Sequence, residues 1–165
     1  VVKIGAYVQQ GGAESGITSL GTLAGVYTPP AIHVDVTVVF TNTNPLRAYR
    51  GNGRPEAAFV IERLIDIAAD EMDIDPVDLR RRNTIAPKAM PYQTALNFNY
   101  DCGEFEKNLD MALELAGYGD FARRREDSRT RGKLRGIGIS NTIERAGSEG
   151  NEGVDIKFDR SGTVT

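Results

Sequence analysis

A turn rich in glycine, proline and arginine stands immediately before the strongest helical pattern in the sequence. The stretch TNTNPLRAYRGNGRPEAAFVIERLIDIA, residues 41–68, holds three arginines, Arg47, Arg50 and Arg54. Pro55 suits the first position of a helix, because its missing N–H has no helical partner there. The spacing of apolar residues predicts a helix from Pro55 to about Asp73 with one buried stripe. The stripe comprises Ala58, Ile61, Ile65, Ala68 and Met72, widened by Phe59 and Leu64.

Two further helical patterns follow this one. Asp75 is a suitable N-cap for a short helix that begins at Pro76, and a second amphipathic helix is expected over residues 104–117, ending at Gly117. Residues 120–133 are expected to form a charged helix or a frayed connector, while residues 84–103 read as an irregular connector.

Strands are predicted on both sides of the helices. Period-two alternation of apolar residues predicts the clearest strand over residues 31–40, and residues 1–8 read as another. Residues 134–146 look like a strand in which Gly136 and Gly138 permit a bend or a close backbone approach. Residues 154–165 are predicted to form a strand, a DRSG turn and the start of a returning strand. This order favours an α+β fold, with a mixed sheet packed against two or three helices.

The composition excludes several classes of protein. A net charge of -3 argues against a nucleic-acid partner, and no apolar run approaches the roughly 20 residues of a membrane span. With Cys102 alone, the chain forms no internal disulfide and holds no cysteine-ligated iron–sulfur cluster, which suits the cytoplasm. Cys102 is either a small buried or bystander residue or a nucleophile. His33 is either a structural or surface residue or a metal ligand.

Both ends of the sequence indicate a piece of a longer protein. The chain begins directly in the strand-like run VVKIGAYV and stops three residues into a returning strand. A returning strand that short leaves its partner largely unpaired.

The turn before the long helix has the chemistry of an anion site. Gly51 and Gly53 permit backbone angles that bring consecutive N–H groups to one point, and the helix N-terminus adds partial positive charge. The arginine forks suit phosphate, carboxylate or a metal-oxo group. The alternative is an ordinary tight turn whose arginines pair with Glu56, Glu62 or other acidic residues.

Several motifs resemble one family of enzymes in the same order along nearly the whole chain. AYRGNGRPEA, ERLIDIAADEM, DPVDLRRRN and MPYQTALNFNYDCGEF resemble the molybdenum-binding large subunit of the xanthine dehydrogenase and aerobic carbon monoxide dehydrogenase family, most of all its carbon monoxide dehydrogenase-like chains with glycine in the AYRG block. The resemblance implies that residues 1–165 are one molybdenum cofactor-binding domain of a longer large subunit. Such a subunit would hydroxylate a small substrate oxidatively, in the manner of a carbon monoxide dehydrogenase or an aldehyde oxidase.

The resemblance also implies roles for the residues of the turn. Arg50, Gly51 and Gly53 would contact the cofactor, with Arg50 beside the molybdenum, and Asn52 would face the substrate. Gly51 replaces the cysteine that holds copper in true carbon monoxide dehydrogenases, so no copper is expected and an aldehyde oxidase or other hydroxylase is favoured. Asn52 replaces an aromatic residue of purine-oxidising members, which argues against xanthine. The family's glutamate base would lie beyond Thr165, so no catalytic residue is assigned.

The same resemblance implies the cofactors and partners. The cofactor would be molybdenum with molybdopterin, in bacteria as its cytosine dinucleotide form. FAD and iron–sulfur clusters would belong to a medium and a small partner subunit, so the piece by itself would be inactive.

The alternative function is a non-catalytic domain for subunit interaction, built on the basic runs RRRN and ARRRED. It predicts that Arg80, Arg81 and Arg82 are exposed, whereas a structural role predicts that at least one of them pairs with neighbouring carboxylates. Asp66 and Asp70 are either solvated carboxylates or a divalent-ion pair.

Overall fold

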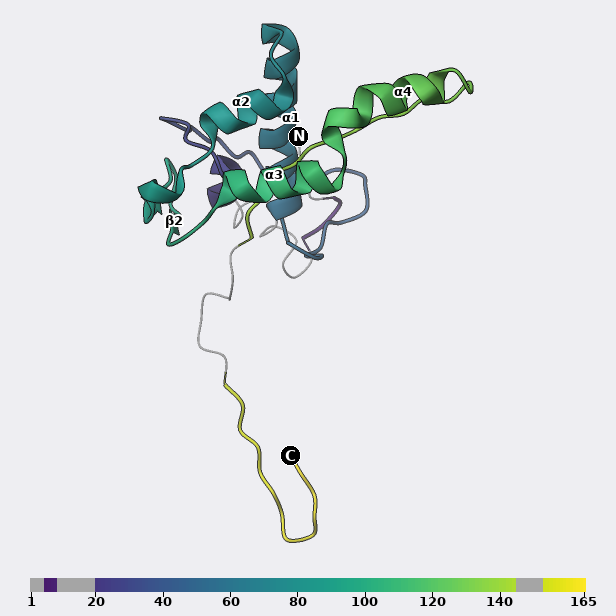
Figure 1. Cartoon of the computed structure of the whole chain (residues 1–165). Helices are drawn as coiled ribbons and strands as arrows, with labels where there is room; N and C mark the ends of the chain where they lie inside the picture. Colours follow the sequence, from purple (N-terminus) through teal and green to yellow (C-terminus); the bar gives the residue numbers. More distant parts are fainter. Residues whose placement is uncertain (1–4, 9–19, 145–152) are drawn as a thin grey trace.

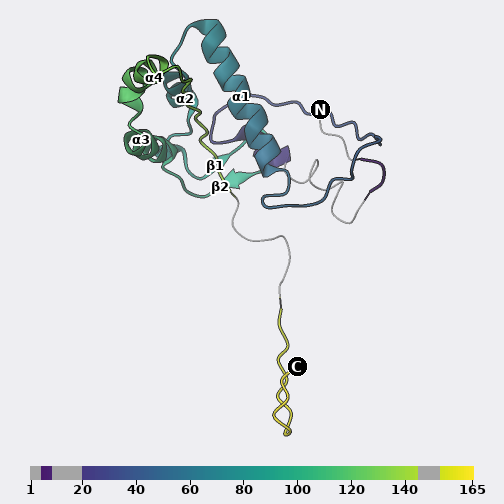
Figure 2. The same ribbon diagram turned by 90° about the vertical axis from the view of Figure 1, so that its right-hand side faces the viewer.

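The computed structural model describes residues 5–8, 20–144 and 153–165. Its central element is α1, Arg54–Met72, whose bounds confirm the predicted helix. Gly53 and Asp73 flank α1 in left-handed conformations, with φ of 89° and 53°. Figure 1 shows α1 crossing the middle of the body, and Figure 2 shows α2, α3 and α4 on one side of it.

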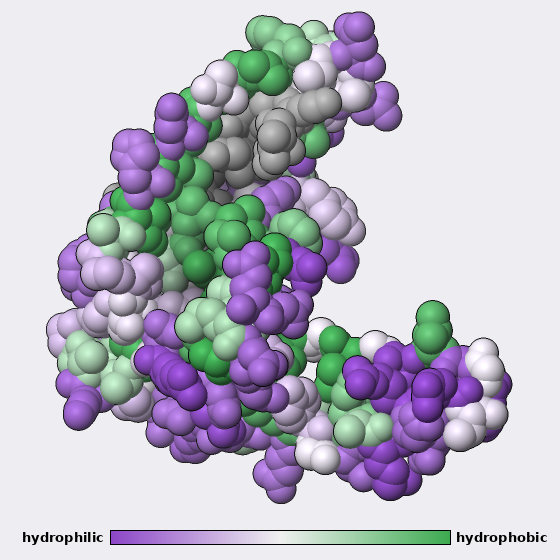
Figure 3. Space-filling view, turned by 90° about the horizontal axis from the view of Figure 1, so that it is seen from above, coloured by the Kyte–Doolittle hydropathy of each residue, from purple (hydrophilic) through white to green (hydrophobic). Residues whose placement is uncertain are grey.

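The buried face of α1 differs from the predicted stripe. Its buried residues are Ala57, Glu62 and Ala69, which face the short helix η2, Leu20–Ala24, and helix α2. Phe59 and Leu64 are 69% and 56% exposed, so the prediction that they widen the buried stripe is wrong for the described residues. The view from above shows hydrophobic residues exposed in green patches on the surface of the body (Figure 3). Periodicity located the helix correctly, but the neighbouring elements decide which of its faces they cover.

The other helices follow their capping signals. Helix α2, Pro76–Asn83, is capped by Asp75, whose Oδ1 accepts from the amides of Val77 and Asp78 at 2.8 and 3.2 Å. Helix α3, Phe105–Leu115, ends before Gly117, which has a φ of 59°. A short turn, η4, Tyr118–Asp120, leads into α4, Phe121–Arg129, so the charged segment is helical.

The paired strands lie within the segment predicted to be irregular. After the short helix η3, Pro87–Ala89, strand β1, Tyr92–Gln93, pairs antiparallel with β2, Asn99–Tyr100. This is the sheet of the described residues, and it is smaller than the predicted mixed sheet. Helices and a small sheet together agree with an α+β fold.

Most predicted strands have no ladder in the described part of the chain. The structure forms no strand over residues 31–40 or 134–144. A Cβ added to Gly136 or Gly138 would have no neighbouring atom within 4 Å, so the predicted close backbone approach is wrong at these glycines. A strand exists only where a neighbour accepts and donates its backbone hydrogen bonds. Of residues 1–8, positions 1–4 lie outside the described residues, as do 145 and 146.

Short backbone contacts replace two of these strands. The Ala6 amide donates to the Thr43 carbonyl at 3.1 Å, and the Thr41 amide donates to Gly5 at 2.9 Å. At the C-terminal end, Phe158 and Val164 form a single bridge across the predicted turn. In the described part of the chain no helix has the length and apolarity that a membrane crossing needs.

Candidate functional site

The turn before α1 has a backbone that only certain residues adopt easily. Gly51, Asn52 and Gly53 have φ values of 93°, 38° and 89°, all in the left-handed region. A Cβ added to Gly51 would lie 3.0 Å from Pro55 Cδ. Glycine at position 51 adopts these backbone angles without strain, and a larger residue would also press on Pro55.

The amides of this turn are partly used within it. The Asn52 amide donates to the Tyr49 carbonyl and the Arg54 amide donates to the Gly51 carbonyl, each at 3.0 Å. The prediction that consecutive N–H groups converge on an anion is therefore wrong for these two amides. A ligand at this turn would therefore not bind through the amides of Asn52 and Arg54.

The three arginines of the turn divide into two kinds. Arg54 Nε lies 3.0 Å from Glu144 Oε1, and its Nη1 donates to the Gly51 carbonyl at 3.3 Å. Arg47 and Arg50 are exposed and form no ion pair with any residue in the described ranges. The Arg50 guanidinium lies 5.9 Å from the centre of the Tyr49 ring. The alternative in which the arginines pair with acidic residues of the chain thus holds for Arg54. The guanidinium groups of Arg47 and Arg50 remain exposed to solvent.

This arrangement fits an anionic oxygen-bearing group. Guanidinium forks bind phosphate or metal-oxo oxygens through paired hydrogen bonds, and α1 directs its positive end toward the same turn. In the described residues, no cluster of three His, Cys, Asp or Glu could hold a metal ion by itself. The assignment of Arg50, Gly51, Asn52 and Gly53 to cofactor and substrate stays a prediction.

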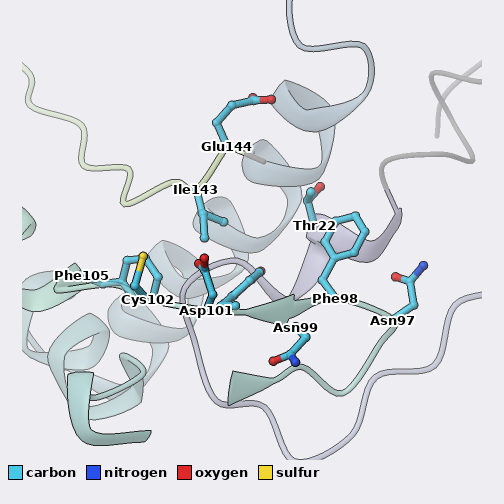
Figure 4. Close-up of a pocket in the computed structure, with 10 residues that line it drawn as sticks. Thr22, Asn97, Phe98, Asn99, Asp101, Cys102, Phe105, Ile143 and Glu144 are labelled. Atoms are coloured by element: carbon cyan, nitrogen blue, oxygen red, sulfur yellow. The ribbon is translucent and has the colours of Figure 1, made fainter. Parts of the chain in front are cut away.

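A cavity of about 700 Å³ lies near the same end of α1. It is formed by residues from three distant segments, among them Thr22, Phe98, Asp101 and Glu144 (Figure 4). Phe98 lies beside Thr22, and Cys102 and Phe105 lie at the other end. No sequence motif predicted this cavity, because only folding brings these segments together.

The two residues with open roles in the sequence are both exposed. Cys102 lies at the cavity, so it is not a buried apolar residue. A hydrogen bond with Asp101 raises the pKa of the Cys102 thiol, which disfavours the thiolate that a nucleophile needs. His33 is also exposed, in agreement with a surface residue.

Arg80 is the most buried charged side chain of the body. It is 0% exposed, and its guanidinium donates to Glu62 Oε2 and Asp66 Oδ1, both at 2.9 Å. Tyr27 donates to the other Glu62 oxygen at 2.7 Å. Burial alone lowers the pKa of Arg80, but the Glu62 and Asp66 carboxylates raise it above its usual value. Burial and the Glu62 carboxylate both raise the pKa of Tyr27.

These contacts decide two alternatives left by the sequence. The structural role of the RRRN run is confirmed, and the exposure of Arg80 required by an interaction domain is wrong, although Arg81 and Arg82 are exposed. Asp66 pairs with Arg80 and its side chain stays 32% exposed, so it is a partly solvated carboxylate with a partner on α2.

Comparison with known proteins identifies the family. Residues 1–84 match the family model of the molybdopterin cofactor-binding domain. The 6-hydroxypseudooxynicotine dehydrogenase complex subunit gamma of Paenarthrobacter nicotinovorans is 30% identical over 98% of this chain and 21% of its own length.

Two solved structures agree with that match. Quinoline 2-oxidoreductase from Pseudomonas putida 86 superposes with a TM-score of 0.67 at 30% identity, covering 79% of this chain and 17% of that one. A Cu,Mo-CO dehydrogenase gives 0.60 at 30% identity, covering 68% and 15%. The chain thus spans about a fifth or less of these relatives. It belongs to the molybdopterin cofactor-binding domain family, which includes the large chains of xanthine dehydrogenases and carbon monoxide dehydrogenases.

Proposed function

We propose that this chain contributes the Arg50 turn to the molybdenum site of a hydroxylase large subunit. The observation that supports the proposal is the exposed Arg50 guanidinium, which has no ion pair among the described residues and stands on a glycine turn at the N-terminus of α1. Arg50 would hold the cofactor's anionic oxygens, with Gly51 and Gly53 letting the backbone approach closely. When bound, the molybdenum group supplies the redox chemistry of oxidative hydroxylation. The role of Arg50 is to stabilise negative charge at that group.

The proposed substrate is a nitrogen-containing aromatic ring, oriented in part by Asn52. Support comes from the relatives named for quinoline and for a nicotine derivative. Gly51 offers no thiol to copper, which argues against carbon monoxide as the substrate. An aldehyde is the other substrate class that the family resemblance favours.

The proposed assembly follows the same family. The cofactor would be the cytosine dinucleotide form of molybdopterin, without copper. FAD in a medium subunit and iron–sulfur clusters in a small subunit would carry the electrons away, in the cytoplasm. Residues 1–165 by themselves would then have no turnover.

The test is Arg50→Ala in the full-length subunit assembled with its partners. We expect turnover per molybdenum to fall about 100-fold or more, in the range seen when one charge-stabilising donor is removed. Molybdenum and pterin content is measured in the same samples. Arg63→Ala, which removes an exposed arginine on α1, is the matched control and should change neither quantity.

Turnover is assayed with quinoline, an aldehyde and carbon monoxide. Oxidation of quinoline alone supports the proposed substrate class. Unchanged cofactor content and turnover in Arg50→Ala would contradict the role of Arg50, and a full-length enzyme without molybdenum would contradict the proposed function as a whole.

A further inference from the structure

We infer that Arg54 and Glu144 form a clamp that positions the Gly51–Gly53 turn, and with it Arg50. The clamp joins the start of α1 to a segment more than eighty residues later in the chain. The inference rests on the proposed function, in which Arg50 contacts the molybdenum group. Neither Arg54 nor Glu144 touches that group in the proposal, so both are positioning residues.

Glu144 follows two contacts that hold its segment against the body. Residues 134–144 contain no helix or strand, yet two contacts precede Glu144. The buried Arg80 donates from Nη2 to the Ile139 carbonyl at 3.1 Å. Asn141, only 3% exposed, donates from Nδ2 to the Phe105 carbonyl at 3.2 Å. Glu144 is therefore anchored to α2 and α3 when it meets Arg54.

Arg54 transmits that anchor to the turn. While Nε faces Glu144, Nη1 donates to the Gly51 carbonyl, which also accepts from the Arg54 amide. One residue thus supplies both donors to the carbonyl that follows Arg50 directly in the chain. Only a guanidinium fork reaches two acceptors in fixed directions, whereas the lysine ammonium is a single point charge on a flexible stem.

The clamp is better suited to positioning than to stabilising the fold. The Arg54 and Glu144 side chains are 29% and 63% exposed, and ion pairs exposed to this extent contribute little to stability. The turn itself consists of residues in left-handed conformations with few internal bonds. Displacement of a reacting group by about 1 Å can lower a rate by about 100-fold, so a weak contact at this place has a large expected effect on turnover.

The experiment uses the full-length subunit assembled with its partners. Arg54→Gln, Glu144→Gln, their double variant and Arg54→Lys are compared with the wild type. The first measurement is hydrogen exchange of the backbone amides in a peptide that covers residues 49–54, which requires no turnover. The second is kcat and KM per molybdenum with a substrate that the wild type oxidises.

We expect exchange in this peptide to accelerate at least about threefold in Arg54→Gln and in Glu144→Gln, because the amides of Asn52 and Arg54 lose their support. The kcat should fall about tenfold with KM within about twofold, the range seen when a supporting contact of a site is removed. The double variant should show the same exchange rate and kcat as Arg54→Gln, since both substitutions break the same ion pair. The exchange rate and kcat of Arg54→Lys should lie between those of the wild type and those of Arg54→Gln.

Arg63→Gln is the matched control and should leave exchange and kcat unchanged. If Arg54→Gln changes neither quantity while Arg50→Ala abolishes turnover, the clamp is wrong and the proposed function stands. Loss of molybdenum with unchanged kcat per molybdenum would also overturn the positioning role, because it indicates a structural one. If Arg50→Ala has no effect, the role proposed for Arg50 fails, and unchanged exchange in the Arg54 and Glu144 variants would overturn the clamp separately.

Discussion

Arg80 and Arg50 show the same side chain in two opposite environments. Arg80 is fully buried and donates to two carboxylates and to the carbonyls of Pro76, Glu62 and Ile139. Arg50 is exposed beside a glycine turn and has no ion pair within the described ranges. A buried guanidinium must satisfy its donors within the protein, whereas an exposed one can donate to water or to a ligand. The comparison indicates a stabilising role for Arg80 and agrees with the ligand contact proposed for Arg50.

Removing Arg80 is expected to have the largest effect on the fold. Arg80→Ala leaves Glu62 buried without its countercharge, which should lower the free energy of unfolding by about 3–5 kcal/mol. Chemical denaturation of the full-length subunit measures the change. Arg81→Ala, which removes the neighbouring exposed pair with Asp110, should cost less than about 1 kcal/mol. Equal effects of the two variants would remove the distinction between buried and exposed arginines.

A cysteine at position 51 tests the glycine turn that carries the exposed Arg50. Gly51→Cys forces a side chain into a left-handed φ and against Pro55, which should destabilise the subunit by about 1–3 kcal/mol. We expect no stoichiometric copper in the purified variant. Gly136→Cys, at a position with open space around it, serves as the control and should be nearly neutral. Copper binding without loss of stability would contradict the expected strain and would show that the missing thiol alone keeps copper out of the native turn.

Substitution of Tyr100 is expected to give the smallest change in the free energy of unfolding, and this change depends on pH. Its hydroxyl donates to the Gly25 carbonyl at 2.8 Å, so Tyr100→Phe should cost about 1 kcal/mol at neutral pH. Burial raises the pKa of Tyr100 to about 12, from an ordinary value of 10.0. The folded state therefore favours the neutral phenol, and this stabilisation is complete below pH 10 and is lost as the pH rises toward 12.

The measurement is the stability of wild type and Tyr100→Phe across pH 8 to 12. The phenylalanine variant should lose less stability above pH 10, since it has no phenol to ionise. Tyr49→Phe, at a side chain that is 78% exposed, should follow the wild-type curve. Parallel curves for wild type and Tyr100→Phe would contradict the raised pKa.

Local signals predicted the helices well. Pro55, the Asp75–Pro76 pair and Gly117 mark ends that the structure places within two residues of the prediction. Each signal acts through the backbone of its own turn, so no distant partner is needed.

The strands were predicted poorly, because a strand needs a partner from a distant part of the chain. Residues 31–40 alternate as a strand should, but no described neighbour supplies the ladder.

The sequence by itself determined the glycine turn, the helix that follows it and the family motif around Arg50. These features depend on residue type and on spacing along the chain. Only the tertiary structure decided which arginine is buried. It also decided that Asp66 pairs with Arg80 and that Glu144 reaches Arg54. Those contacts join residues far apart in the sequence, and their charges and hydrogen bonds are matched only when packing brings the segments together.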